Sequence, residues 1–353
     1  MKVCIIKQLY DVLGPNTSFK YKDITIDDIF NNHIAKYNGL ESYLLFEADS
    51  YILNSYNFTR HECECIKNNN LDNNVEVKKI YFNNLGKTIS EKDIPYGEYD
   101  IVWCRDPILN NIKHYKIVYP RTLFIYEEVE HERGTSNKSN FYDLILKHNK
   151  SNFANSIKLP SVISFPYPKC PDKIRNIINI DKIYQIYIDY RDICKLCNCE
   201  ERDKFKDKIK SFYNYIKNRY KIPIVCNLQN SLSGCCFSFE GVSDVKPYLE
   251  LLGKSKYYVS TYGRVGQALV DAACLNCICF GSSKSHNHKI LCHPFTLFNN
   301  FQLPETILTK INEIENNKTL EKEILEYQNQ RLYKYYVDYQ KNVLKKALEL
   351  KMK

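Results

Sequence analysis

The chain has 353 residues, of which 44% are hydrophobic and 26% are charged. This composition is typical of a globular protein and excludes a collagen-like or coiled-coil fibre. The length favours two domains, each large enough to bury a core without metals or disulfides. No run approaches the roughly 18 apolar residues of a membrane span, and a strand-like run begins at Val3, two residues after Met1, so we expect a cytoplasmic protein.

The cysteine count suggests a disulfide-rich protein and the formal charge of +9 suggests a nucleic-acid-binding one, but the distribution of these residues along the chain favours neither. The 15 cysteines are scattered through predicted strands and helices, so we interpret them as reduced thiols and not as a disulfide scaffold. Most basic residues are lysines, and the chain is also rich in Asn, Ile and Tyr, as AT-rich codons would produce. The positive charge forms no stripe of the kind that nucleic-acid binding requires.

From Lys2 to about Pro166, short β-rich runs alternate with amphipathic ones, which predicts a mostly parallel sheet with helical crossovers. The expected strands are Val3–Lys7, Ser50–Leu53, Val75–Phe82, Asp100–Cys104, Thr122–Tyr126 and Val162–Phe165. The expected helices are Ile26–Lys36, Thr59–Lys67 and Tyr142–His148. Residues 1–166 are therefore predicted to form the first domain.

Prolines then mark a linker. Three of the chain's 12 prolines fall between Phe165 and Pro171, where proline disfavours regular helix or central strand, so residues 167–182 are predicted to connect two domains.

After the linker the alternation resumes and predicts a second α/β domain over residues 183–318. Its expected strands are Ile183–Tyr190, Ile222–Asn227, Tyr257–Ser260 and Cys277–Phe280, and its expected helices are Arg202–Arg219, Ser243–Leu252, Gly266–Leu275 and Ile307–Ile314. Residues 319–353 are predicted to form a long helix that packs back toward the first domain. The fold class is therefore α/β, with two Rossmann-like domains facing a central cleft at the carboxyl ends of their strands.

The turn between the strand ending at Ser260 and the helix starting near Gly266 is the most informative segment. Gly263 and Gly266 leave backbone N–H groups accessible, and the helix start adds partial positive charge, a combination that suits a phosphate. Arg264 lies between them and can bind phosphate with two parallel hydrogen bonds. The alternative is that the glycines only let the helix pack close to the sheet.

These residues resemble a known family. The run Ser260–Gly281 is similar to the donor-binding segment of group 1 glycosyltransferases with the GT-B fold, S-x-x-E-G-x-G-x-P-x-x-E-A-x-A-x-G-x-P-V. Gly266 matches the second glycine, Asp271 the second acid, and Cys277–Phe280 the following strand. The opening run Met1–Pro15 also resembles the first strand and loop of such enzymes.

The resemblance implies a glycosyltransferase that moves a sugar from a nucleotide-diphosphate donor, bound by the second domain, to an acceptor hydroxyl. The implied donor-binding residues are Arg191, Ser260, Thr261, Tyr262, Gly263, Arg264, Val265, Gly266, Gln267 and Asp271. Within this set, Asp271 is the candidate for the ribose hydroxyls, and Arg191 for the leaving diphosphate or for an ion pair with Asp189 or Asp192. Gly263 stands where retaining members of the family have their first acid, so a retaining mechanism is not implied.

An inverting transferase also needs a general base from the first domain. Acidic residues and a histidine follow several predicted strands there, and among them we favour Asp11, Glu128 and His131 as catalytic candidates. A cluster of titratable groups after a buried strand is costly unless it faces a cleft. The alternative is a solvated loop rim.

No resident metal or cofactor is expected, and the nucleotide sugar is a co-substrate. Cys194, Cys197 and Cys199 have zinc-like spacing but lack an obvious fourth ligand. The expected partners are a nucleotide-sugar donor and a glycan, protein, lipid or modified nucleic-acid acceptor. Two alternatives remain, a nucleotide-sugar epimerase of the same fold and a non-catalytic, Lys-rich nucleic-acid-binding protein.

Overall fold

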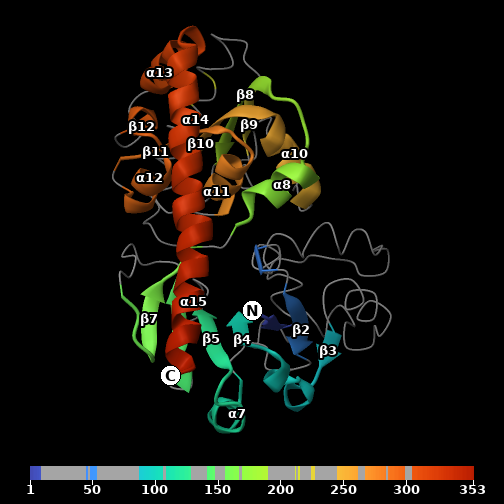
Figure 1. The fold of residues 1–353 in the computed structure, drawn as a ribbon. Helices are drawn as coiled ribbons and strands as arrows, with labels where there is room; N and C mark the ends of the chain where they lie inside the picture. Colours follow the sequence, from blue (N-terminus) through green and yellow to red (C-terminus); the bar gives the residue numbers. More distant parts are fainter. Residues whose placement is uncertain are drawn as a thin grey trace, which may run out of the picture. The chain divides into compact units, whose positions relative to one another are not determined.

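The structure is a computed structural model, in which the chain forms two compact units (Figure 1). It describes residues 1–8, 45–46, 48–53, 87–105, 109–128, 141–147, 156–166, 169–189, 211, 214, 224–226, 245–260, 267–283, 285–298 and 304–353. Unit 1 contains Met1–Cys170 and Tyr336–Lys353, and unit 2 contains Pro171–Tyr335. The predicted elements Ile26–Lys36, Thr59–Lys67 and Val75–Phe82 lie outside the described residues, as does nearly all of Arg202–Arg219.

Unit 1 is built on a seven-stranded, all-parallel sheet with the order β3-β2-β1-β4-β5-β6-β7. Its strands are β1 (Val3–Gln8), β2 (Asp49–Leu53), β3 (Lys87–Ile89), β4 (Ile101–Arg105), β5 (Leu123–Glu128), β6 (Leu144–Lys147) and β7 (Ser161–Ser164). All five residues of β4 are buried, as expected for a central parallel strand with both faces covered. This confirms the α/β class predicted from the alternating pattern.

Different elements cover the two faces of this sheet. On one face, Val343, Leu344 and Ala347 of the terminal helix α15 (Tyr339–Lys351) join a core that contains Trp103 of β4. On the other face the core is rich in tyrosine and includes Tyr115 of helix α7 (Ile112–Val118). Two 3₁₀ turns, η4 (Glu91–Asp93) and η5 (Tyr96–Glu98), lie between β3 and β4 in the chain.

Unit 2 contains a five-stranded, all-parallel sheet with the order β12-β11-β10-β8-β9. Its strands are β8 (Ile183–Asp189), β9 (Ile224–Cys226), β10 (Ser255–Ser260), β11 (Ile278–Ser282) and β12 (Leu297–Phe298). Its helices are α8 (Pro171–Ile177), α10 (Val245–Lys254), α11 (Gln267–Cys274), α12 (His286–Leu291), α13 (Pro304–Asn316) and α14 (Lys318–Tyr333), with the 3₁₀ turn η8 (Pro294–Thr296) before β12. Isoleucines and leucines of α13 and α14 pack on β10 and β11 in its core.

The helix predicted at Tyr142–His148 was wrong, and two other predicted segments show features that the sequence did not indicate. The segment Tyr142–His148, predicted as a helix, contains strand β6, because a short apolar run buried on both faces of a sheet has no period that distinguishes it from a helix. Residues 167–182, predicted as linker, contain α8, which begins at Pro171, a position where a helix tolerates proline. The long terminal helix is present, but a π-helical turn at Lys334–Asp338 separates α14 from α15.

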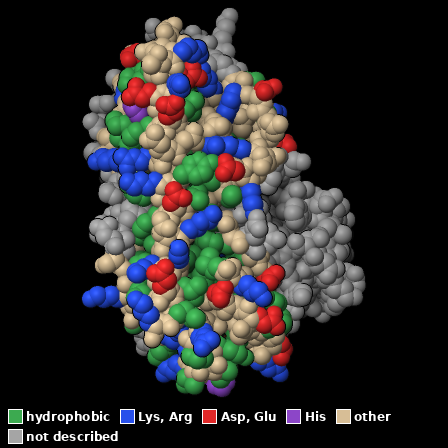
Figure 2. Space-filling model, in the orientation of Figure 1, with side chains coloured by type: hydrophobic (Ala, Val, Ile, Leu, Met, Phe, Trp, Pro, Cys, Tyr) green, Lys and Arg blue, Asp and Glu red, His purple; other side chains and the backbone are tan. Residues whose placement is uncertain are grey.

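Charged side chains of both signs are interspersed over the described part of the face drawn in Figure 2. Lys and Arg do not gather into a stripe on that face. Among the described residues, no helix is both long and apolar enough to cross a membrane.

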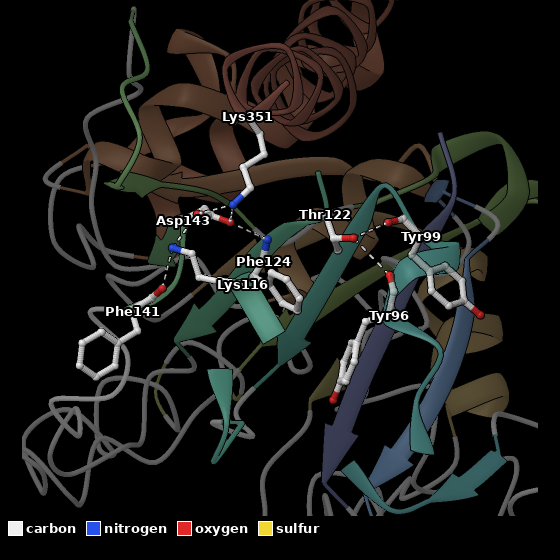
Figure 3. Close-up of polar contacts among 8 residues, drawn as sticks. All are labelled: Tyr96, Tyr99, Lys116, Thr122, Phe124, Phe141, Asp143 and Lys351. Carbon is white, nitrogen blue, oxygen red and sulfur yellow. Dashed lines mark hydrogen bonds and ion pairs between the residues drawn. The ribbon is translucent and has the colours of Figure 1, made fainter. Parts of the chain in front are cut away.

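A buried aspartate joins three elements at the amino ends of β5 and β6 in unit 1 (Figure 3). The Asp143 carboxylate contacts Lys116 Nζ of α7 at 2.7 Å and Lys351 Nζ of α15 at 3.0 Å, and it accepts a hydrogen bond from Phe124 N at 2.9 Å. Nearby, Thr122 Oγ1 donates to the carbonyl oxygens of Tyr96 and Tyr99. These contacts stabilise the sheet at the amino ends of its strands. In open parallel sheets, ligands bind at the opposite, carboxyl ends of the strands.

Candidate functional site

In the described sheet of unit 2, the strand order reverses direction between β8 and β10, which is a topological switch point. β9 follows β8 in the chain and pairs on one side of it, whereas β10 pairs on the other side. In open parallel sheets, ligands bind outside the carboxyl ends of the strands at such a switch point. Asp189 and Ser260, the last residues of β8 and β10, are register partners, so the two strands end side by side there.

The predicted donor-binding residues follow these two strands. Ser260 ends β10 and is 3% exposed, Gln267 is the first residue of α11, and Asp271, one turn into α11, is 8% exposed. The structure therefore places these three at the carboxyl edge of the sheet and the helix that follows. Arg191, Thr261, Tyr262, Gly263, Arg264, Val265, Gly266 and the side chain of Gln267 lie outside the described residues.

Helix α11 is anchored at its far end. Asn276 has a φ of 58° after the last helical residue, Asn276 N donates to Ala273 O at 3.1 Å, and Cys277 N donates to Ala272 O at 2.9 Å. This is a Schellman cap, which satisfies carbonyl groups at the helix end. Arg175 Nε of α8 adds a hydrogen bond to Cys274 O at 2.6 Å. The partial negative charge at the carboxyl end of α11 is therefore compensated. The partial positive charge lies at its amino end, which follows the segment that connects β10 to α11.

A buried histidine packs at the end of the neighbouring strand β11. His288 of α12 is fully buried, and its Nδ1 accepts a hydrogen bond from Ser282 N at 2.7 Å. A Cβ at Gly281 would lie 2.9 Å from three atoms of His288, so only glycine fits there. Because Nδ1 is the acceptor, the proton of the neutral ring resides on Nε2.

Unit 1 has its own switch point, between β1 and β4, because β2 and β3 pair on one side of β1 and the remaining strands on the other. At the carboxyl end of β4, Arg105 faces Glu127 of β5 in register, with 3.7 Å between Nε and Oε1. Both side chains are buried, with exposures of 3% and 0%. The structure therefore shows Glu127 as a partner of Arg105, whereas Asp106, the next residue in the chain, lies outside the described residues.

Of the three catalytic candidates, the structure describes only Glu128. It ends β5, and its carboxylate lies 2.6 Å from Lys147 Nζ, the residue that faces it on β6. Each side chain of this pair is partly exposed. Asp11 and His131 lie outside the described residues, so their distance from Glu128 stays a prediction.

The cysteines of the described residues are free thiols: Cys4, Cys104, Cys170, Cys274, Cys277, Cys279 and Cys292. Burial raises the pKa of Cys104 to about 12, which disfavours the reactive thiolate. Within the described ranges, no three His, Cys, Asp or Glu side chains form a group that could hold a metal ion. Cys194, Cys197 and Cys199 lie outside those ranges.

Comparison with known proteins gives matches in structure alone. No protein-family model matches the chain, and no curated protein matches it in sequence. A UDP-forming α,α-trehalose-phosphate synthase from Burkholderia xenovorans superimposes with a TM-score of 0.52 and 9% identity over 100% of both chains. A trehalose-6-phosphate synthase gives 0.51 and 8% over 98% of this chain and 99% of its own. The corresponding UDP-forming synthase from Burkholderia vietnamiensis gives 0.50 and 8% over 99% and 100%. The likeness spans both units and establishes the fold.

Proposed function

We propose that this chain, which has the GT-B fold of two Rossmann-like domains, is a glycosyltransferase that uses a nucleotide-diphosphate sugar. The observation that carries the proposal is the strand order of unit 2. The chain segments that contain Arg191 and Gly263 to Gly266 begin directly after the two strands that flank its switch point. Glycines, an arginine and a helix start after such strands are suited to a diphosphate.

In this proposal the donor nucleotide binds to unit 2. The backbone N–H groups of Gly263 to Gly266 and the start of α11 hold the diphosphate, with Arg264 and Arg191 neutralising its charge as the sugar leaves. Asp271 accepts hydrogen bonds from the ribose hydroxyls. The trehalose-phosphate synthases that superimpose on the chain are UDP-forming, so UDP is the first nucleotide to test.

The acceptor is assigned to unit 1. A general base there, Asp11, Glu128 or His131, removes the proton from the attacking hydroxyl as the bond to the anomeric carbon forms. Lys147 Nζ lies 2.6 Å from the Glu128 carboxylate and already takes up part of its hydrogen-bonding capacity. Asp11 and His131 are therefore the stronger candidates for proton removal. No metal is assigned to the reaction.

Calorimetric titration with UDP tests the donor site. The wild-type chain is expected to bind UDP, and Arg264→Ala to weaken binding by about tenfold or more, the typical loss for a charge-assisted hydrogen bond. Lys322→Ala serves as the control, because this exposed cation of α14 pairs with Glu326 on the helix surface. Equal losses in the two variants, or unchanged affinity in Arg264→Ala, would remove Arg264 from the site.

Incubation with a UDP-sugar alone separates transfer from epimerisation. A transferase changes no ring carbon of the sugar other than the anomeric one, and it releases UDP only as the sugar passes to an acceptor or to water. Conversion of the donor into its epimer without any acceptor would replace the transferase assignment with an epimerase.

A further inference from the structure

Unit 2 contains an open cavity of about 480 Å³ at the amino ends of its strands, the opposite edge from Asp189 and Ser260. Lys182 directly precedes β8, Lys256 lies near the start of β10, and Ile278 begins β11. Residues at or just after the carboxyl ends of α8, α10 and α11 line the same space. The volume falls within the roughly 300–1,000 Å³ of small-molecule sites.

Two cations that line this cavity bond only to neutral groups among the described residues. Arg175 Nε donates to Cys274 O at 2.6 Å, and Arg175 Nη2 donates to Asn329 Oδ1 at 2.6 Å. Lys182 Nζ donates to Ser255 O at 2.7 Å. These bonds use two of the five N–H groups of the guanidinium, so Arg175 retains donors for a ligand.

Both cations contact the short turn between α11 and β11. Arg175 bonds the carbonyl group of Cys274, the last residue of α11, and Lys182 Nζ donates to Cys277 Sγ at 3.2 Å, just before β11. Leu275 and Asn276, the residues between, also line the cavity. The two cations therefore face one region of the cavity.

The third cation of the cavity is neutralised by acids. Lys256 Nζ lies 2.8 Å from Glu315 Oε1 and 3.0 Å from Glu321 Oε1, and Lys318 Nζ lies 2.8 Å from Glu321 Oε2. Two lysines and two glutamates thus balance one another. Glu321 is the one acid among the described residues that line the cavity, so the excess positive charge belongs to the other two cations.

A structural role alone would limit these two cations to compensating the partial negative charge of helix ends. That role explains the bond to Cys274 O but does not require a cavity beside the cations. Apolar side chains line the cavity as well, among them Ile180, Leu275 and Leu325. A space with two uncompensated cations and an apolar surface is suited to an anionic group on an uncharged body.

We propose that this cavity binds a small phosphate monoester, with the phosphate at Arg175 and Lys182 and the body against Ile180, Leu275 and Leu325. A phosphate monoester carries a charge of about −1.5 to −2 at pH 7, which matches two cations, and its oxygens suit the guanidinium. The site lies at the opposite edge of the sheet from the proposed donor site, so the inference does not rest on the transferase function.

Calorimetric titration of the full chain with phenyl phosphate, with and without saturating UDP, tests the site. The wild type is expected to bind phenyl phosphate in both conditions. Arg175→Gln and Lys182→Gln should each weaken binding about tenfold, because an amide is able to donate to the same carbonyl oxygens but carries no charge. Lys322→Gln, which removes an exposed cation of α14 paired with Glu326, should leave the affinity unchanged.

Glu321→Gln separates binding from a structural role. It removes the acid that repels a phosphate, so the affinity for phenyl phosphate should rise about threefold, a gain that a purely structural role does not produce. Absence of binding in the wild type, unchanged affinity in both cavity variants, or an equal loss in Lys322→Gln would overturn the proposal. Phenyl phosphate binding without UDP binding would overturn the transferase function and leave this site standing.

Discussion

At the scale of single residues, the carboxyl edge of unit 2 depends on a close approach between Gly281 and His288. Gly281→Ala would place a Cβ 2.9 Å from the His288 ring, at the end of a buried strand. We expect this variant to lose about 1–3 kcal/mol of unfolding free energy in urea, as overpacked cores do. In a chain that already carries His288→Ala, Gly281→Ala should cost less unfolding free energy than it does in the wild type, because the clashing ring is gone. Additive losses would contradict the steric account.

His293 is the residue whose titration should be visible in stability. It lies beside Tyr327, and burial lowers its pKa from the ordinary value of 6.5, while Glu323 at 3.7 Å acts in the opposite direction. A folded-state pKa below the unfolded value means that the unfolded chain binds the proton more readily. Above pH 6.5 this difference in proton binding does not affect the free energy of unfolding. As the pH falls below 6.5, it should lower the free energy of unfolding.

His293→Asn isolates this contribution. The His293 Nδ1 accepts a hydrogen bond from Phe295 N at 3.2 Å at the start of η8, and an asparagine oxygen is able to take its place. Thermal midpoints measured between pH 7.5 and 5.5 should therefore fall less steeply in the variant than in the wild type. Parallel curves would show that His293 does not titrate differently on unfolding.

At the scale of elements, the ion pair between Lys351 and Asp143 adds to the apolar packing that holds α15 on the sheet of unit 1. Lys351→Met removes a contact of 3.0 Å to a buried carboxylate that retains Lys116, so we expect a loss of about 1–2 kcal/mol in urea unfolding. Lys346→Met removes an exposed pair with Glu349 on the same helix and should cost less than about 0.5 kcal/mol. Equal losses in the two variants would mean that the buried carboxylate does not anchor the helix.

Sequence patterns predicted those elements whose signals are local. The strand Tyr257–Ser260 and the helix Gly266–Leu275 were placed within two residues of β10 and α11, because a glycine-rich turn separates a β-branched and aromatic run from small helix formers. β6 was assigned wrongly because Leu144–Lys147 acquires strand geometry only from pairing with β5 and β7. Local patterns carry no information about such pairing.

The same limit applies to the candidate site. Ser260 and Asp271 became candidates because they belong to one continuous segment of sequence. Arg105 and Glu127 are 22 positions apart in the sequence. They pair only because the register of β4 and β5 places them opposite each other. No local sequence pattern joins Glu127 to Arg105. Burial and register supply that connection.

At the scale of the whole molecule, the distribution of charge separates the proposed function from nucleic-acid binding. The formal charge is +9, yet acidic and basic side chains are interspersed on the face drawn in Figure 2. Nucleic-acid binding requires a contiguous basic surface and weakens steeply with salt. The described part of that face shows no such contiguous basic surface.

The central claim is that a nucleoside diphosphate binds where β8 and β10 end in unit 2, and hydrogen exchange with and without UDP tests it most directly. UDP is expected to slow exchange in peptides from residues 255–283, which span β10, α11 and β11, and to leave peptides from residues 123–147 of unit 1 unchanged. Protection confined to unit 1, or none at saturating UDP, would contradict the account.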